Sequence, residues 1–395
     1  MDLPFDASTV VYLDNAATTF PKPKEVLEQA FAAYAGFGVN PGRSGYDLCL
    51  AAGDLVAQTR RELTSFFGGG GDPDRLVFAA NATDALNLLI QGVLAEGDHA
   101  VSTTIEHNSV IRPLNHLARD RGVEVEFVPV AGDGRVDPRA LARRLRPNTR
   151  LVIVNHGSNV IGTIQPVAEI GAECRKRGIT FAIDASQTAG VVPIDMRAMA
   201  VDVVAFTGHK SLLAPTGIGG LCVGDGVEIR PTRFGGTGVN SVNPYHLDEY
   251  PFRLEAGTGN VLGIAGLHFG LAYIAARGMD AIYRHEMALF AVLQDGLAAA
   301  GVTLHGTTSL EHRLPVLSFT VAGRDPSDLG TLLDVEYGVA ARTGLQCAPL
   351  IHRQMGTGAR GTVRFSVGPM NTRADVDTAV AAVAEIAAAA RAVVA

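Results

Sequence analysis

Short apolar runs alternate with amphipathic stretches over the first two-thirds of the chain. Runs typical of buried strands occur at Leu76–Phe78, Ala100–Ser102, Val123–Val130, Leu151–Val154, Thr180–Asp184 and Val201–Phe206. Between these runs, helical spacing predicts helices at Thr83–Leu94, His107–Arg121 and Pro166–Arg177. Because such runs suit strands buried on both faces, the alternation predicts an α/β fold with a mostly parallel sheet covered by helices.

The pattern changes after about Glu255, which predicts a second, smaller domain. Two long helices are predicted first, at Gly259–Arg277 and Met279–Ala300. Shorter elements follow at Val302–Leu304, Val316–Val321, Pro326–Val335, Val339–Ala341 and Thr362–Ser366, before an Ala-rich terminal helix. We therefore expect a large domain over residues 20–255. Residues 1–19 and 256–395 would form a smaller α+β domain.

The composition narrows the possible classes of function. The chain has 395 residues, 47% of them hydrophobic, and a net charge of −7 without long runs of like charge. This mildly acidic balance argues against a nucleic-acid partner. No apolar stretch reaches membrane-spanning length without polar interruption, and Met1–Asp6 has no signal-peptide pattern. We expect a cytoplasmic protein that acts on or binds a small molecule, with no membrane partner.

The cysteines are too far apart for shared chemistry. Cys49, Cys174, Cys222 and Cys347 form no pair with metal-ligand or redox-motif spacing. We expect no metal site and a reducing compartment, so that any cysteine chemistry depends on one thiol.

A lysine directly follows the apolar run Val201–Phe206. The sequence there is Thr207-Gly208-His209-Lys210. Open α/β sheets bind ligands just beyond the carboxyl ends of their strands. A lysine that is partly desolvated there has a lowered pKa and attacks carbonyl groups. A solvated surface lysine is the alternative interpretation of this residue taken alone.

Further polar residues follow other predicted strands. Ala82 and Thr83 open a helix whose backbone N–H groups, with the Thr83 hydroxyl, would hold a phosphate; an ordinary N-cap by Asn81 or Thr83 is the alternative. Asp184 closes a strand, where it would pair with a protonated pyridine nitrogen or act as a cap. His107 begins a helix and offers a flat ring for stacking, although a surface or capping role is equally ordinary.

Taken together, these residues match the requirements of pyridoxal 5′-phosphate (PLP). Thr207 and His209 flank Lys210 and are placed to reach phosphate oxygens, and Gln187 follows Asp184 closely. The set supplies a phosphate cradle, a stacking ring, a carboxylate for a ring nitrogen and an amine for an aldehyde. Because the joint occurrence is far more specific than any one residue, the sequence predicts a PLP site.

Several stretches also carry a family resemblance. They are Tyr12–Thr18, Glu106–Ser109, Asn155–Gly162, Asp184–Gln187, Thr207–Lys210, Glu255–Thr258 and Arg342–Ala348. With them the chain resembles the class V aminotransferase-like, fold-type I PLP enzymes, and within these the cysteine desulfurases. The resemblance covers essentially the whole chain and implies a PLP-dependent enzyme that is a homodimer.

The resemblance implies a role for each residue around the cofactor ring. Lys210 would bond covalently to the aldehyde of PLP. Asp184 would pair with the pyridine nitrogen, His107 would stack on the ring, and Gln187 would bond the phenolic oxygen. Asn159 would lie beside the ring.

The resemblance also assigns contacts to the phosphate and to the substrate. The phosphate would be held by Ala82, Thr83, Thr207 and His209. Thr258 would join them from across a homodimer interface. The substrate would be bound by Asn15, Arg342 and Arg364, with Arg364 clamping its carboxylate as a bidentate fork.

Cys347 is predicted to lie in a loop before Pro349. Arg342, His352 and Arg353 are close in sequence, and positive charge favours the reactive thiolate. A buried inert thiol is the alternative, and it is our interpretation of the other cysteines. The resemblance implies that Cys347 attacks the sulfur of L-cysteine and carries a persulfide while L-alanine leaves. Lys210, with His107 as a partner, would move the α-proton, and an acceptor protein or thiol would collect the sulfur.

The short cysteine loop resembles the SUF-type (group II) branch of the family. Leu345 and Gln346 stand where many SUF-type members have two histidines, which leaves the acceptor and a preference for L-selenocysteine open. The alternatives are a selenocysteine lyase, an epimerase or aminotransferase for a small amino acid, and a non-catalytic scaffold. The pathway also stays open between iron–sulfur cluster assembly, cofactor thiolation and sulfur recovery.

Overall fold

The structure, a computed structural model, describes residues 9–42 and 44–394, and a seven-stranded sheet lies at its centre. Its strand order is β2-β8-β7-β6-β5-β3-β4. The bounds are β2 (Leu76–Ala79), β3 (His99–Thr103), β4 (Glu124–Val128), β5 (Thr149–Asn155), β6 (Thr180–Asp184), β7 (Val203–Thr207) and β8 (Gly219–Val223). The neighbouring strands from β4 to β7 are all parallel, which confirms the predicted α/β fold with a mostly parallel sheet.

The strand β8 is absent from the sequence prediction. It pairs antiparallel with β2 and with β7. The strand begins with Gly219 and Gly220, and paired glycines are ordinarily read as a turn. A Cβ atom at Gly220 would lie 2.2 Å from the carbonyl oxygen of Val77. Glycine is therefore required by the close approach of two strands here and marks no turn.

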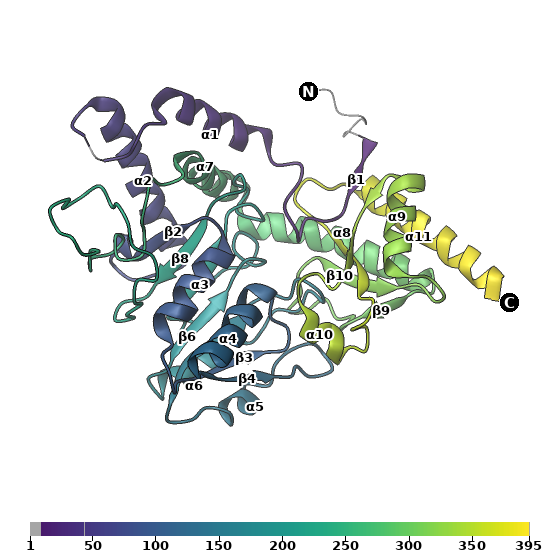
Figure 1. Cartoon of the computed structure of the whole chain (residues 1–395). Coiled ribbons are helices and arrows are strands. Elements are labelled where there is room, and N and C mark those ends of the chain that lie inside the picture. Colours follow the sequence, from purple (N-terminus) through teal and green to yellow (C-terminus); the bar gives the residue numbers. More distant parts are fainter. Residues whose placement is uncertain (1–8, 43, 395) are drawn as a thin grey trace.

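Both faces of the large sheet are buried beneath helices. Phe181 and Ile183 of β6 belong to one hydrophobic cluster, and Ala182 between them belongs to the other. Residues of α3 (Ala82–Val93) and α4 (Asn108–Arg121) cover one face. Residues of α2 (Asp47–Phe66), α5 (Pro138–Ala142), α6 (Val167–Arg175) and α7 (Val261–Arg277) cover the other (Figure 1). Burial on both faces explains why these strands are apolar throughout.

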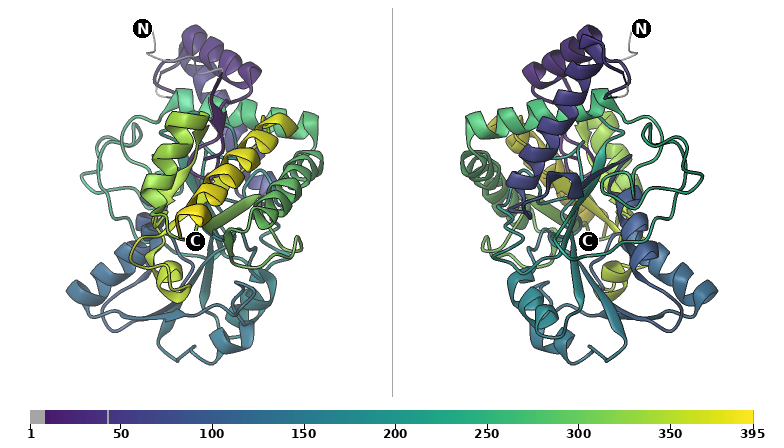
Figure 2. Two further views of the ribbon diagram at one scale, coloured as in Figure 1. Left: turned by 90° about the vertical axis from the view of Figure 1, so that its right-hand side faces the viewer. Right: turned by 90° about the vertical axis from the view of Figure 1, so that its left-hand side faces the viewer.

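A four-stranded antiparallel sheet forms the smaller α+β region. Its order is β12-β13-β10-β9. The bounds are β9 (Thr303–His305), β10 (Val316–Thr320), β12 (Arg342–Gly344) and β13 (Thr362–Ser366). It shares a separate hydrophobic cluster with α8 (Met279–Ala299), α9 (Pro326–Tyr337) and α11 (Arg373–Val394). Figure 2 shows α9 and α11 (lime and yellow) beside each other over this sheet.

The beginning of the described chain joins the smaller region to the large one. β1 (Val11–Tyr12) pairs in parallel with β11 (Val339–Ala340), and Asp14 forms a bridge with Ser366 at the end of β13. The chain then enters α1 (Lys24–Phe37), which packs with α2 against α7. α7 begins after residue 255, in the part assigned to the smaller domain, yet it packs on these helices of the large one. The predicted domain boundary at 255 stays a prediction.

One bent pair of helices is the nearest approach to a membrane span. Among residues 9–42 and 44–394, no single helix is long and apolar enough to cross a membrane, and α7 and α8 pass only together, with a bend of 79°. The predicted lack of a signal peptide concerns Met1–Asp6, which lies outside the described residues.

Candidate active site

The carboxyl ends of the central strands bring polar side chains together. Asn155 at the end of β5 lies opposite Asp184 at the end of β6 in the parallel register. The next strand, β7, ends at Thr207, and Lys210 follows after a turn. Such an edge is where open α/β sheets bind their ligands.

A cavity of about 320 Å³ lies at this edge. Most of the site residues predicted from the sequence line it, namely Ala82, Thr83, His107, Asn159, Asp184, Gln187, Thr207, His209, Lys210, Arg342, Cys347 and Arg364. The fold thus collects residues from the large sheet and from the smaller region around one space. The two exceptions, Asn15 and Thr258, are described below.

The amine of Lys210 is set up to act as a nucleophile. The side chain is half-buried and lies in the cavity. Burial lowers the pKa of Lys210 from 10.5 to about 8, and the nearby carboxylate of Asp184 opposes the shift. A substantial fraction of the amine is therefore neutral at mildly alkaline pH, as attack on an aldehyde requires.

His107 is a neutral ring at the wall of the cavity. It is the N-cap of α4, where Nδ1 accepts the backbone N–H of Ser109 at 3.1 Å. Burial first, and then the neighbouring Lys210 charge, lower the pKa of His107 to about 4. The ring therefore presents an uncharged face for stacking. His107 therefore both caps α4, the role named as an alternative, and lines the cavity as predicted.

Asp184 and Gln187 are held in fixed orientations. Asp184 is 4% exposed and accepts hydrogen bonds from the backbone N–H and the hydroxyl of Ser186, at 2.9 and 2.5 Å. Gln187 donates its amide to the carbonyl of Ala16 at 2.9 Å. Buried carboxylates are stable as anions only with such partners, or with a cation. Asp184 is accordingly placed to pair with a protonated ring nitrogen.

One end of the cavity offers donors without partners. Among the described residues, the buried Thr207 Oγ1 and His209 Nδ1 have no hydrogen-bond partner. The Thr83 hydroxyl lies 2.7 Å from that of Ser109, near the N-terminus of α3. Buried polar atoms without partners are rare unless a ligand completes them. A helix N-terminus, hydroxyls and an imidazole fit a phosphate group, and with the other cavity residues they fit PLP.

The helix start beside this phosphate end is capped by Asn81. Its side chain accepts the N–H of Asp84 at 3.0 Å. The N-cap alternative is therefore correct for Asn81, while Thr83 keeps its hydroxyl on the cavity side with Ser109.

Arg364 supplies a buried guanidinium opposite the large sheet. It lies in β13, is 2% exposed, and forms an ion pair with Asp14. Its Nη1 donates to the carbonyl of Asn159 at 2.9 Å, and among the described residues Nε has no partner. Arg342 lies opposite Arg364 in the register of β12 and β13 and is exposed. Two positive groups thus face the cavity, where they suit a carboxylate.

Asn15 lies outside the cavity lining. Its amide donates to the carbonyl of Ser366 and to the side chain of Asn371, both at 3.0 Å. These contacts tie the segment after β1 to the end of β13 and to the segment before α11. The substrate-binding role of Asn15 stays a prediction.

Cys347 is exposed and lies between β12 and α10 (Pro349–Gln354). The expectation that His352 adds positive charge near it is wrong. His352 is fully buried, and burial lowers its pKa to about 4, so the ring is neutral. The cations that line the cavity with Cys347 are Lys210, Arg342 and Arg364.

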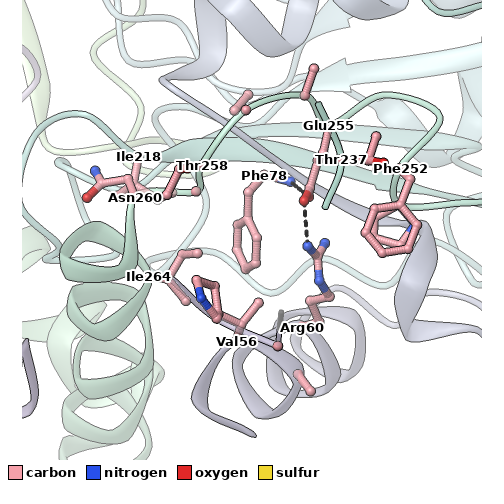
Figure 3. A pocket seen from close by; sticks show the side chains of 18 of the residues that line it. Val56, Arg60, Phe78, Ile218, Thr237, Phe252, Glu255, Thr258, Asn260 and Ile264 are labelled. Carbon is pink, nitrogen blue, oxygen red and sulfur yellow. Dashed lines mark hydrogen bonds and ion pairs between the residues drawn. The ribbon is translucent and has the colours of Figure 1, made fainter. Parts of the chain in front are cut away.

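Thr258 lies in a different cavity, of about 600 Å³ (Figure 3). In it, Arg60 Nη2 forms an ion pair with Glu255 at 2.7 Å, and Glu255 also accepts the backbone N–H of Phe78 at 2.6 Å. Among the described residues that line the two cavities, none is shared. Thr258 therefore lies outside the Lys210 cavity within one chain, and its role across an interface stays a prediction.

Several residues at the site had no predicted role, among them Ser109, Ser186 and Glu106. Ser109 and Ser186 orient His107 and Asp184 by hydrogen bonds. Glu106 is fully buried, accepts the N–H of Asn155 at 3.0 Å, and has its pKa raised to about 8 by burial. The signal in the sequence is that they lie within the resemblance stretches Glu106–Ser109 and Asp184–Gln187.

Comparisons with known proteins agree with this geometry. A family model described as aminotransferase class V matches residues 11–379. A probable cysteine desulfurase of Methanothermobacter thermautotrophicus is 34% identical over 373 residues, covering 93% of this chain and 92% of that protein. The chain belongs to the cysteine desulfurases of the class V aminotransferase family. This membership confirms the predicted PLP-dependent cysteine desulfurase.

Solved structures of cysteine desulfurases share the fold over nearly the whole chain. An apo structure from Thermococcus onnurineus has a TM-score of 0.91 and 31% identity, covering 98% of this chain and 99% of that one. A crystal structure from Escherichia coli, with an S-sulfonic acid, has a TM-score of 0.86 and 29% identity, covering 98% and 96%. They confirm the fold-type I assignment.

The lowered pKa of Lys210 predicts how this cysteine desulfurase takes up PLP. In protein stripped of PLP, the rate of uptake should rise by about tenfold per pH unit at low pH and level off above about 8, because only the neutral amine attacks. Absorbance of the bound cofactor measures the rate, with N-acetyl-lysine as the exposed reference. A rise that continues to the pH of the reference amine contradicts the desolvated environment.

Proposed function

We propose that this chain takes sulfur from L-cysteine, releases L-alanine, and passes the sulfur on from Cys347. The observation that carries the proposal is that the thiol of Cys347, the amine of Lys210 and the guanidinium of Arg364 line one cavity. An aminotransferase or an epimerase needs the amine and the guanidinium but has no use for a thiol there.

The cavity residues have distinct parts in holding PLP. Lys210 would hold it covalently and Asp184 would pair with its ring nitrogen, while Thr83, Thr207 and His209 would bind its phosphate. When bound, PLP draws electrons from the bonds at the α-carbon of the amino acid. Side chains of this protein would orient the substrate, move the proton and take up the sulfur.

Arg364 would orient the substrate by its carboxylate, with the ion pair to Asp14 fixing the guanidinium. Lys210 would then move the α-proton, with the neutral His107 beside it. The sulfur of Cys347 attacks the substrate sulfur, so that an S–S bond forms as the C–S bond breaks. The electron pair stays with the carbon fragment, which takes up a proton and leaves as L-alanine.

A second cavity supports delivery of the sulfur to an acceptor. This cavity, distinct from the one at Thr258, measures about 460 Å³ and is bounded by α3 and α4. It shares four lining residues with the Lys210 cavity, namely Thr83, His107, Ser109 and Cys347. Because Cys347 borders both spaces and is exposed, a second thiol reaches it without entering the substrate cavity. The acceptor in this proposal is a thiol, either small or carried by a protein.

A homodimer is part of the proposal. Thr258 is exposed and lines a cavity with no residue of the Lys210 cavity among its described lining. Large apolar side chains nearby in sequence are also exposed, with Phe234 at 72%, Tyr245 at 81% and Val242 at 94%. Such exposure is typical of a surface that another chain covers.

We also propose a cytoplasmic setting and a pathway. Cys174, Cys222 and Cys347 are free thiols, which fits a reducing cytoplasm. The short loop before Cys347 resembles the SUF-type branch, so we propose a role in iron–sulfur cluster assembly. L-selenocysteine is a second substrate to compare with L-cysteine, since the same groups would bind it.

Replacing Cys347 tests the sulfur-transfer step. Cys347→Ser should abolish sulfide and alanine release from L-cysteine with a reductant present, because a hydroxyl does not take up sulfur. Absorbance should show PLP still bound, and L-alanine measured beside sulfide gives the stoichiometry. Cys174→Ala, which alters a buried thiol in α6, is the matched control and should keep full turnover. Turnover that survives in Cys347→Ser points to a lyase without a persulfide.

Arg364 should control substrate binding. Arg364→Lys keeps the positive charge but loses the planar fork, so KM for L-cysteine should rise by about tenfold or more. PLP absorbance should stay unchanged, because Arg364 is opposite the ring-holding residues. An unchanged KM in steady-state kinetics would remove Arg364 from the substrate site.

Mixed dimers test whether Thr258 serves the neighbouring chain. Lys210→Ala and Thr258→Ala are made in separate chains, which are then combined. If Thr258 acts across the interface, the mixed dimer regains one complete site, since the Thr258→Ala chain keeps Lys210 and receives Thr258 from its partner. PLP retention and alanine formation by the mixed dimer should then exceed those of both parents. No recovery beyond the parents would place Thr258 within its own chain's site or outside any site.

A further inference from the structure

The loop that carries Cys347 has an unusual backbone conformation. Gln346 has φ +42° and Cys347 has φ +58°, following Gly344 at φ +88°. Residues with a Cβ atom rarely adopt this left-handed region, and two in succession are unfavourable unless their surroundings hold them. The structure holds them in two ways, through the side chain of Gln346 and through the backbone on both sides.

The Gln346 side chain is a buried bridge between two elements. It is 4% exposed. Its Oε1 accepts from Nε2 of His352 in α10 at 2.7 Å, and its Nε2 donates to the carbonyl of Thr362 in β13 at 3.0 Å. The Gln346 amide therefore ties the loop to the helix that follows it and to the adjacent strand.

His352 is suited to donate a hydrogen bond to the Gln346 amide. Its Nδ1 lies 2.9 Å from the hydroxyl of Thr357, which leaves Nε2 to carry the proton toward Gln346, a tautomer assigned from these contacts. Since burial keeps the ring neutral, the donor is present across the ordinary pH range. His352 lies outside the lining of the cavity, and its contact nearest the cysteine loop is the one with Gln346.

The peptide groups of the loop are tied to the large region. Nδ2 of Asn159 donates to the carbonyl of Gln346 at 2.7 Å. The backbone N–H of Asn108, next to His107, donates to the carbonyl of Cys347, also at 2.7 Å. The thiol-bearing residue is thus fixed relative to the wall on which the cofactor ring stacks.

We propose that Gln346 is a positioning residue for Cys347. Gln346 borders the cavity, but both atoms of its amide are engaged by His352 and Thr362. Its amide therefore holds the left-handed turn that places the thiol at the cavity, and it acts through Cys347. The inference rests on the proposed function, because it concerns the residue that takes the sulfur. Attack of one sulfur on another depends on distance and alignment, so a loosened turn should slow this step and leave substrate binding intact.

The main test replaces the bridging amide with an apolar side chain. Gln346→Leu should lower kcat for alanine formation from L-cysteine by about 10- to 100-fold, as expected for a small displacement of a reacting group. KM, PLP absorbance and the absorbance change on adding L-cysteine should match wild type. Rapid mixing, with mass spectrometry of the Cys347 peptide, locates the loss in persulfide formation.

Gln354→Leu is the matched control. Gln354 is the last residue of α10, the helix that carries His352, and is exposed. It accepts from the hydroxyl of Thr104 at 2.6 Å and donates to the carbonyl of Val130 at 2.6 Å, away from the cysteine loop. The substitution Gln354→Leu removes a comparable set of hydrogen bonds and should keep the kcat of the wild-type protein. Equal kcat for Gln346→Leu and Gln354→Leu would overturn the proposal.

Gln346→Gly separates positioning from mere stability and covers a failure of Gln346→Leu to fold. Glycine suits a positive φ, so the variant should fold while lacking the bridge. A kcat as low as that predicted for Gln346→Leu supports the proposal, and wild-type kcat overturns it. Wild-type protein that forms no persulfide on Cys347 would instead refute the proposed function, a result seen before any variant is made.

Discussion

The parallel register of β5, β6 and β7 is the constraint on which the site depends. Parallel strands end at one edge of a sheet, and each strand here delivers a polar group there. Asp184 lies opposite Asn155, and Lys210 follows the next strand. Asp184 is buried at this edge, and burial of Lys210 beside it lowers the pKa of the amine. Reactivity at this edge is thus a consequence of the fold.

The smaller region completes the site from the opposite side. β13 carries the buried Arg364, whose ion pair with Asp14 joins the start of the described chain to its last strand. The loop between β12 and α10 carries Cys347. The large region therefore holds the groups that fit the cofactor, and the smaller region brings the guanidinium and the thiol. A reaction between two sulfur atoms needs both regions in fixed relation.

The sequence predicted what depends on local pattern and missed what depends on tertiary contact. The apolar run before Thr207 placed Lys210 just beyond the end of a strand, because strand period and strand ends are visible in a sequence. Its role as a site lysine followed only from the other polar residues of the set. The strand β8 was missed because its glycines serve close strand packing. His352 was expected to be charged, but burial makes it neutral.

The positioning residues could not be predicted either, because their roles depend on tertiary contacts. Ser109, Ser186 and Gln346 act by hydrogen bonds whose partners become adjacent only in the fold. The roles of Asn15 and Thr258 came from the family resemblance, and a single chain leaves both outside the Lys210 cavity. Such roles depend on a substrate or on a second subunit, neither of which the pattern of one chain encodes.

The most direct test of the central claim is peptide mass spectrometry after a single turnover. The protein with PLP is mixed with one equivalent of L-cysteine in the absence of reductant, and L-alanine is measured in the same sample. The account predicts one added sulfur on the peptide that contains Cys347 and an equal amount of L-alanine. L-alanine formed without sulfur on Cys347, or with sulfur on Cys174 or Cys222, would contradict it.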